Sequence, residues 1–145
     1  MQELGYNYRI TDIQAALGIS QLKRAKYNLV KRQEIANTYK KAMELLGVKY
    51  QEVKNNYNNA FHLFVIEVEN RLGLYNFLRE NGIYAQIHYI PVHLHPYYQN
   101  IGWKKGDFPV SENYYQHCIS LPMFPTLKIE EQEYVIQKVK EFCDE

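Results

Sequence analysis

The sequence has few cysteines and lacks a long hydrophobic run. Its 145 residues include only Cys118 and Cys143, which do not form the C-x-x-C spacing of common zinc and redox motifs. We therefore expect reduced thiols and a cytoplasmic protein. No apolar segment approaches the roughly 20 residues that cross a bilayer, and Met1 is not followed by the pattern of a secretory signal peptide. The composition therefore predicts no membrane partner.

An excess of charge of one sign is also missing. The chain has 17 Lys and Arg against 16 Asp and Glu, a net charge of +1. This balance argues against a nucleic-acid partner, which usually requires a basic surface. Tyrosine, in contrast, is abundant at 14 residues. Its apolar ring and polar tip suit half-buried interfaces and sugar or nucleobase sites.

The segment Gly82–Tyr98, GIYAQIHYIPVHLHPYY, is the most informative one. From Ile83 to Ile90 apolar residues alternate with Tyr84, Gln86 and His88, a period that predicts a strand with one apolar and one polar face. Pro91 ends this strand because it has no N–H to donate. Two interpretations stay open, the wall of a ligand site and the half-exposed strand of an ordinary sheet.

The remaining patterns predict an α+β domain with two leading helices. Thr11 and Gln14 form a T-x-x-Q capping box that begins the first helix, whose apolar stripe continues to Leu22. A second helix follows over residues 27–46 and ends at Gly47. We then expect a small sheet covered by helices on one face, with strands at 61–69, 83–90 and 119–121 and helices at 72–81, 109–116 and 129–142.

Several residues of metal-binding or nucleophilic type occur without a recognisable motif. The spacing H-x4-H-x-H matches no metal site, so we predict that the chain holds no metal. Cys118 could act as a nucleophile beside a histidine, but its neighbours favour packing at the end of a strand. No Walker A, G-x-G-x-x-G or G-x-S-x-G motif is present. The residues considered are His88, His93, His95, His117 and Cys118.

Four segments, in this order, resemble the DegT–StrS family of sugar aminotransferases over almost the whole chain. They are GYNYRITDIQAALG at Gly5–Gly18, IHYIPVHLHPYY at Ile87–Tyr98, GDFPVSENYY at Gly106–Tyr115 and SLPMFPTL at Ser120–Leu127. Within the family, the sequence around NYRITDIQAALG and QIHY is most similar to that of enzymes that aminate a UDP-linked 4-keto-6-deoxy-N-acetylhexosamine on the way to pseudaminic acid.

The resemblance implies the aspartate-aminotransferase fold, with a large pyridoxal 5'-phosphate domain, a small C-terminal domain and a homodimer. It implies that glutamate loads the cofactor with an amino group, which then passes to C4 of the keto-sugar. We expect this chain to be the C-terminal part. Residues 1–47 would be an extended N-terminal segment and two helices that link to the large domain. Residues 48–145 would be the small domain, with a mainly antiparallel sheet.

In this family the Schiff-base lysine and the acidic partner of the pyridinium nitrogen belong to the large domain. We therefore expect no catalytic residue in this chain, and no activity from the chain alone. Two alternatives remain open. One is a dehydratase of the same fold, in which histidine replaces the lysine, and the other is a non-catalytic module that binds a sugar nucleotide or a protein.

The resemblance assigns binding roles to five residues. Asn7 matches the asparagine that reaches across the dimer toward the cofactor phosphate and the substrate, although it could instead cap a turn. The remaining four match the segment that touches the nucleotide-sugar, and the alternative for them is ordinary sheet structure. These four are Gln86, Ile87, His88 and Tyr89. One departure is Lys128, where relatives often carry a Thr or Ser that caps the final helix.

Overall fold

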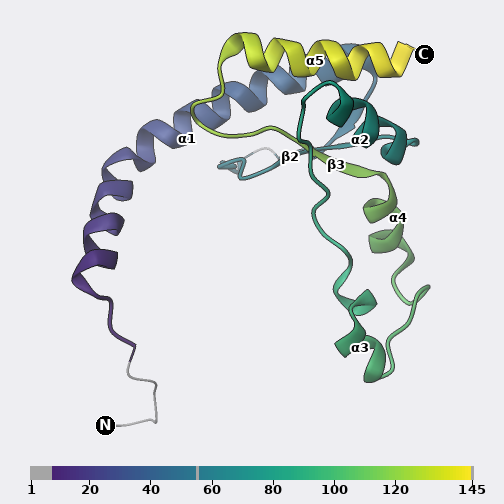
Figure 1. Ribbon diagram of the computed structural model, residues 1–145, viewed down its shortest axis with the longest axis horizontal. Coiled ribbons are helices and arrows are strands. Elements are labelled where there is room, and N and C mark those ends of the chain that lie inside the picture. The colour runs from purple at the N-terminus through teal and green to yellow at the C-terminus, as the bar shows by residue number, and fades with distance from the viewer. Residues whose placement is uncertain (1–7, 55, 145) are drawn as a thin grey trace.

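We analysed a computed structural model, which describes residues 8–54 and 56–144 (Figure 1). Helix α1 comes first and is followed by two strands and helix α2. A short 3-10 helix, η1, and helix α3 precede α4, and strand β3 and helix α5 complete the chain. The bounds are α1 Asp12–Leu46, β1 Lys49–Tyr50, β2 Phe64–Glu67, α2 Arg71–Glu80, η1 Val92–Leu94, α3 Pro96–Asn100, α4 Pro109–His117, β3 Cys118–Leu121 and α5 Ile129–Asp144.

Helix α1 is a single helix of 35 residues, so the prediction of two leading helices is wrong. The predicted capping box is present, with the Thr11 hydroxyl accepting from the Gln14 N–H and the Gln14 side chain accepting from the Thr11 N–H. The segment that was expected to separate the helices, residues 23–26, reads KRAK. These are good helix formers without glycine or proline, so the backbone continues through them.

The two halves of α1 lie in different surroundings. Ile35, Tyr39 and Met43 in the C-terminal half are buried in the core, whereas Ile13 and Leu17 in the N-terminal half are exposed. In Figure 1 the N-terminal half, drawn in purple, extends away from the sheet and from α5. The apolar stripe that sequence periodicity predicted there is therefore not covered by any described part of this chain.

Strands β1, β2 and β3 form an antiparallel sheet in that order, which confirms the predicted α+β class and the mainly antiparallel sheet. Phe64 pairs with Leu121, and Glu67 pairs with Cys118. Helices α1, α2 and α5 cover one face of this sheet (Figure 1). The core between them contains Phe64, Ile66, Ile119 and Leu121 from the strands and Tyr39, Met43, Leu74, Leu78, Val135 and Val139 from the helices.

The strand predicted at residues 83–90 does not form as a strand. Only Gln86 pairs with the sheet, by donating to the main-chain oxygen of Ser120 at 3.1 Å and accepting from its N–H at 2.7 Å. In this register residues 89 and 90 would face His117 and Gln116, which belong to α4, so pairing with β3 could not extend beyond His88. The strand predicted at residues 61–69 is likewise shorter, at Phe64–Glu67.

Beyond Pro91 the chain leaves the sheet and forms an excursion that we call the arm, residues 91–108, which contains η1 and α3. Figure 1 shows the arm projecting from the sheet and returning through α4. The sequence predicted the helix at Pro109 but not η1, α3 or the two-residue strand β1. In the described residues, no helix is both long enough and apolar enough to span a membrane.

Candidate functional site

Gln86 and His88 lie on the sheet face opposite the helices. Residues paired across an antiparallel bridge point to the same face, so the side chain of Gln86 lies on the same face as that of Ser120. Ser120 is absent from the core, whereas its neighbours Ile119 and Leu121 are part of it. The predicted polar face of this segment therefore exists, although the segment pairs with the sheet at one residue only.

The His88 ring is held by Ser120. Its Nδ1 atom lies 2.9 Å from the Ser120 hydroxyl oxygen, and the ring is half-buried while Ser120 is 3% exposed. The Tyr89 ring meets the His88 ring edge-on, with centroids 4.7 Å apart, and Tyr89 itself is 69% exposed. Gln86 is exposed and Ile87 is half-buried. Three of the predicted binding residues thus offer an amide, an imidazole and an aromatic ring next to one another.

Cys118 lies beneath this segment and has no solvent access. Its Sγ atom contacts the main-chain oxygen atoms of His88 at 3.7 Å and Tyr115 at 3.8 Å. Burial raises the pKa of the thiol, which disfavours the thiolate that a nucleophile requires. The packing role suggested by its neighbours in the sequence is confirmed.

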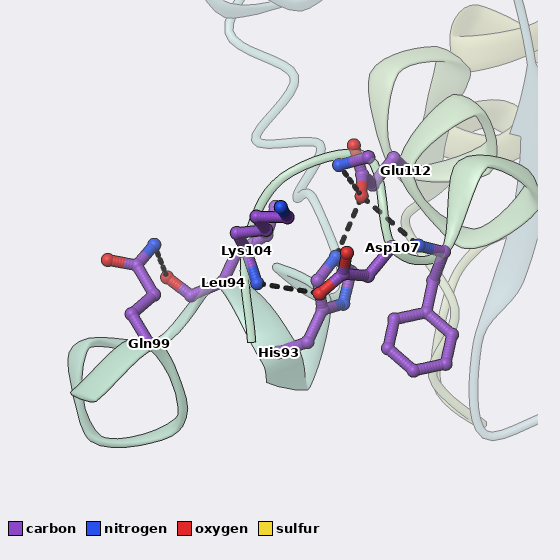
Figure 2. Close-up of polar contacts among 8 residues, drawn as sticks. His93, Leu94, Gln99, Lys104, Asp107 and Glu112 are labelled. Carbon is purple, nitrogen blue, oxygen red and sulfur yellow. Dashed lines mark hydrogen bonds and ion pairs between the residues drawn. The ribbon is translucent and has the colours of Figure 1, made fainter. Parts of the chain in front are cut away.

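A buried histidine–glutamate pair joins the arm to α4 (Figure 2). His93 Nε2 lies 2.8 Å from Glu112 Oε1, and each residue is 7% exposed. The same oxygen accepts from the Gly106 N–H at 2.7 Å and from the Phe108 N–H at 3.5 Å. The hydrogen bond from His93, followed by these backbone bonds, lowers the pKa of the Glu112 carboxyl even though burial opposes the shift. One carboxylate thus holds the start and the end of the arm together.

Aromatic rings of the arm line a hollow beside this pair. The Phe108 ring lies 4.8 Å from the His93 ring and 5.3 Å from the Trp103 ring, centroid to centroid. The hollow has a volume of about 350 Å³, and its wall is mostly apolar. Its lining residues are Val92, His93, Tyr98, Trp103, Phe108 and Ser111.

The structure separates the histidines that the sequence suggested as metal ligands. His88 bonds to Ser120, His93 to Glu112, and His117 to the main-chain oxygen of Asn113. Within residues 8–54 and 56–144, no group of three or more His, Cys, Asp and Glu side chains is arranged to hold a metal ion. Asn7, the remaining predicted site residue, lies outside the described residues.

Sequence reasoning missed Ser120 and Glu112 as parts of this site. Each carried a weak signal. Ser120 is a polar residue in the short apolar strand Cys118–Leu121, and Glu112 is an acidic residue in the first turn of α4 after Pro109. Neither signal identifies the partner, which lies 32 residues from Ser120 and 19 residues from Glu112.

Comparison with known proteins places this arrangement in context. Over 99% of its length the chain is 31% identical to the UDP-4-amino-4,6-dideoxy-N-acetyl-beta-L-altrosamine transaminase of Campylobacter jejuni, of which it covers 42%. It is 37% identical to the spore coat polysaccharide biosynthesis protein SpsC of Bacillus subtilis and 33% identical to the GDP-perosamine synthase of Escherichia coli O157:H7. These two alignments cover 94% and 96% of the chain and 38% of each relative. The chain therefore spans about two fifths of the length of its curated relatives.

A solved structure repeats the fold of the chain. DesV from S. venezuelae, in complex with a ketimine intermediate, superposes with a TM-score of 0.93 over 99% of this chain and 39% of DesV, at 28% identity. The family model of the DegT/DnrJ/EryC1/StrS aminotransferases matches residues 1–140. This match includes every predicted site residue and covers nearly the whole sequence. The chain belongs to the DegT/DnrJ/EryC1/StrS aminotransferase family.

Proposed function

We propose that this chain is the C-terminal part of a pyridoxal-phosphate-dependent nucleotide-sugar aminotransferase and that it contributes substrate-binding groups. The observation that carries the proposal is that Gln86 and His88 lie on the sheet face opposite α1, α2 and α5, with the Tyr89 ring edge-on against the His88 ring. Family membership supplies the class of reaction. In the proposed enzyme, residues 1–47 link to the large domain and residues 48–145 form the small domain.

The described residues do not by themselves fit the cofactor. Each described lysine is exposed or half-exposed, and Lys31 and Lys138 form ion pairs with Glu34 and Glu141. None is enclosed in the way that a Schiff-base lysine requires. We assign this lysine to the large domain. When bound, pyridoxal phosphate supplies the carbonyl group that exchanges the amine.

The role proposed for this chain is to bind and orient the substrate. The Gln86 amide can donate to and accept from sugar hydroxyls, the His88 ring offers one further polar atom, and the exposed Tyr89 ring offers an apolar face. Ile87 contributes main-chain groups of the same segment. Asn7 is proposed to reach the cofactor phosphate and the substrate across a homodimer in the cytoplasm.

The substrate that we propose is a UDP-linked 4-keto-6-deoxy-N-acetylhexosamine, with glutamate as the amino donor. The motifs around Asn7 and Gln86 support this choice, as does the similarity to a UDP-sugar transaminase. Relatives of comparable identity include a GDP-perosamine synthase, so the test must compare the two nucleotides.

The test is amine transfer from glutamate to UDP-linked and GDP-linked 4-keto-sugars by the longer enzyme. We expect amination of the UDP-sugar, a several-fold higher KM for this sugar in the Gln86→Ala and His88→Ala variants, and unchanged kinetics in Gln51→Ala. Gln51 is a matched control because it is exposed next to β1, at the opposite edge of the sheet. A deoxygenated product without nitrogen would identify a dehydratase and contradict the proposal.

The chain by itself tests the alternative of a free-standing binding module. We expect weak binding of UDP-N-acetylhexosamine to the 145-residue chain in a calorimetric titration, because the proposed pocket requires the large domain and a second subunit. Micromolar affinity would show that the chain is an independent binding module.

A further inference from the structure

The Ser120 hydroxyl is a buried polar group with one partner. It lies on β3 between two core residues, is 3% exposed, and meets the His88 Nδ1 atom at 2.9 Å. Among the described residues, this is the one hydrogen bond that the structure provides for the Ser120 side chain. A hydroxyl that is buried without a hydrogen-bond partner destabilises a fold. The pairing with His88 is therefore part of the structure rather than a chance contact.

The direction of this hydrogen bond follows from the need of the hydroxyl proton for an acceptor. If His88 Nδ1 carried a proton and donated it to Ser120, the Ser120 O–H would itself be buried without an acceptor. If Ser120 donates to Nδ1 instead, both groups are satisfied. A neutral imidazole carries one proton, so His88 would then carry it on Nε2.

Main-chain hydrogen bonds fix the position of His88 relative to Ser120. Gln86 and Ser120 exchange two backbone hydrogen bonds, and His88 follows Gln86 by two residues on the same face. A residue two positions along a paired strand is a diagonal neighbour, within reach of a ring. The Cys118 thiol adds a contact to the main-chain oxygen of His88 at 3.7 Å. The backbone near His88 is therefore held in place independently of the hydrogen bond between the His88 ring and the Ser120 hydroxyl.

We propose that Ser120 is a positioning residue that holds His88 in the Nε2–H tautomer, so that the ring offers a hydrogen-bond donor to the substrate. The phosphate groups of a nucleotide-sugar are acceptors, and its hydroxyls can accept, so a donor suits this ligand class. The link to substrate rests on the proposed function of this chain. The tautomer itself is a property of the chain and is tested separately.

The first test is NMR spectroscopy of the 145-residue chain labelled with ¹⁵N-histidine, at a pH of about 9, above the roughly 6.5 pKa of free imidazole. The His88 signals are assigned by their loss in His88→Gln. We expect a protonated Nε2 and an unprotonated Nδ1 in the wild-type chain, and a mixture of both tautomers in Ser120→Ala. Ser20→Ala, on the exposed half of α1, is the matched control and should match the wild type.

Two NMR results would overturn the proposal. One is a His88 ring protonated on Nδ1 in the wild-type chain, and the other is an unchanged His88 spectrum in Ser120→Ala. Ser120→Thr keeps the hydroxyl in a residue type that strands favour, so it should restore the wild-type tautomer. If the Thr variant does not fold, the Ala variant still decides the outcome, since it only removes one oxygen atom.

The second test measures kinetics in the longer enzyme. Loss of orientation should raise KM for the nucleotide-sugar several-fold in Ser120→Ala while kcat changes much less, and Ser120→Thr should restore KM. An unchanged KM with an altered tautomer would remove the role in substrate binding. A wild-type enzyme without aminotransferase activity would contradict the proposed function but not the proposed tautomer. The NMR experiment would still test which nitrogen of His88 carries the proton.

Discussion

At the scale of single residues, a few polar side chains join segments that are distant in sequence. Arg32 on α1 donates from Nη1 to three main-chain oxygen atoms, those of Phe61 at 3.0 Å, His62 at 3.2 Å and Met123 at 3.1 Å. It thereby ties α1 to the segment before β2 and to the turn after β3. Glu112 plays a similar part for the arm, where it accepts from His93, Gly106 and Phe108.

Removal of the Arg32 guanidinium should destabilise the domain. In Arg32→Met the carbon stem is kept, but three carbonyl groups lose a charged donor, so we expect a fall of about 2–3 kcal/mol in the free energy of unfolding. Chemical denaturation measures this change. Arg24→Met, on the exposed half of the same helix, is the control and should change stability by less than about 0.5 kcal/mol. Equal effects of the two substitutions would show that the three hydrogen bonds contribute nothing specific.

Glu112 should make stability depend on pH in the acid range. Its folded-state pKa is lowered below the usual 4.5, chiefly by the hydrogen bond from His93. The unfolded state therefore binds a proton first, and the stabilisation is fully present above that usual value and is lost as pH falls through the lower folded-state pKa. Denaturant unfolding of the wild type and of Glu112→Gln, followed from neutral pH to about pH 3, should converge as the pH falls. A constant difference between the two proteins would contradict this assignment.

At the scale of elements, the start and the end of α1 are determined by capping residues, and packing stabilises only part of the helix. The capping box at Thr11 begins the helix, and Gly47, with a φ of +66°, ends it in the left-handed region. No atom lies within 4 Å of a Cβ added at Gly47 or at Gly18. A substitution at either position therefore reports on backbone conformation rather than on steric contact.

The two glycines of this helix should respond to alanine with opposite signs. Gly47→Ala forces a side chain into the left-handed region and should destabilise the domain by about 1–2 kcal/mol. Gly18→Ala lies within the helix and should raise its helicity, with a gain of up to about 1 kcal/mol in local helix stability. Thermal unfolding monitors the first substitution, and circular dichroism monitors the second. A loss of helicity in Gly18→Ala would show that this glycine has a close neighbour in solution.

At the scale of the whole molecule, the chain combines a closed core with two projecting parts. The core lies between the sheet and helices α1, α2 and α5, whereas the N-terminal half of α1 and the arm extend away from it (Figure 1). Both projections expose large apolar side chains, among them Ile13, Leu17, Leu22, Tyr97 and Trp103. This distribution agrees with the proposal that the chain is completed by a large domain and a second subunit.

Hydrogen exchange of the isolated chain should reveal the same division. Amides in residues 16–28 belong to a helical segment with almost no buried side chain, and such a segment is marginally stable in water. Amides in residues 36–44 lie beside the buried Tyr39 and Met43 and should exchange much more slowly. Mass spectrometry of peptides from the two halves measures the difference. Equal protection would mean that the exposed half of α1 is covered in solution, for example by a second copy of the chain.

The sequence by itself determined the features whose causes are local. The capping box at Thr11, the glycine at position 47 and the proline at position 109 act through groups within a few residues, and each marks the expected boundary in the structure. The α+β class followed from hydrophobic periods, and the family followed from four ordered motifs. Periodicity does not predict the continuity of α1, because the basic stretch KRAK at residues 23–26 carries no apolar stripe, although its residues are good helix formers.

Only the tertiary structure decided which distant residues meet. The segment 83–90 has the period of a strand, but in the structure only Gln86 pairs with the sheet, at Ser120 of β3. The same pairing brings Ser120 to His88, and the return of the arm brings Glu112 to His93. Hydrogen bonds of this kind require separations near 3 Å between segments far apart in the chain, and no local pattern of residues specifies such a separation.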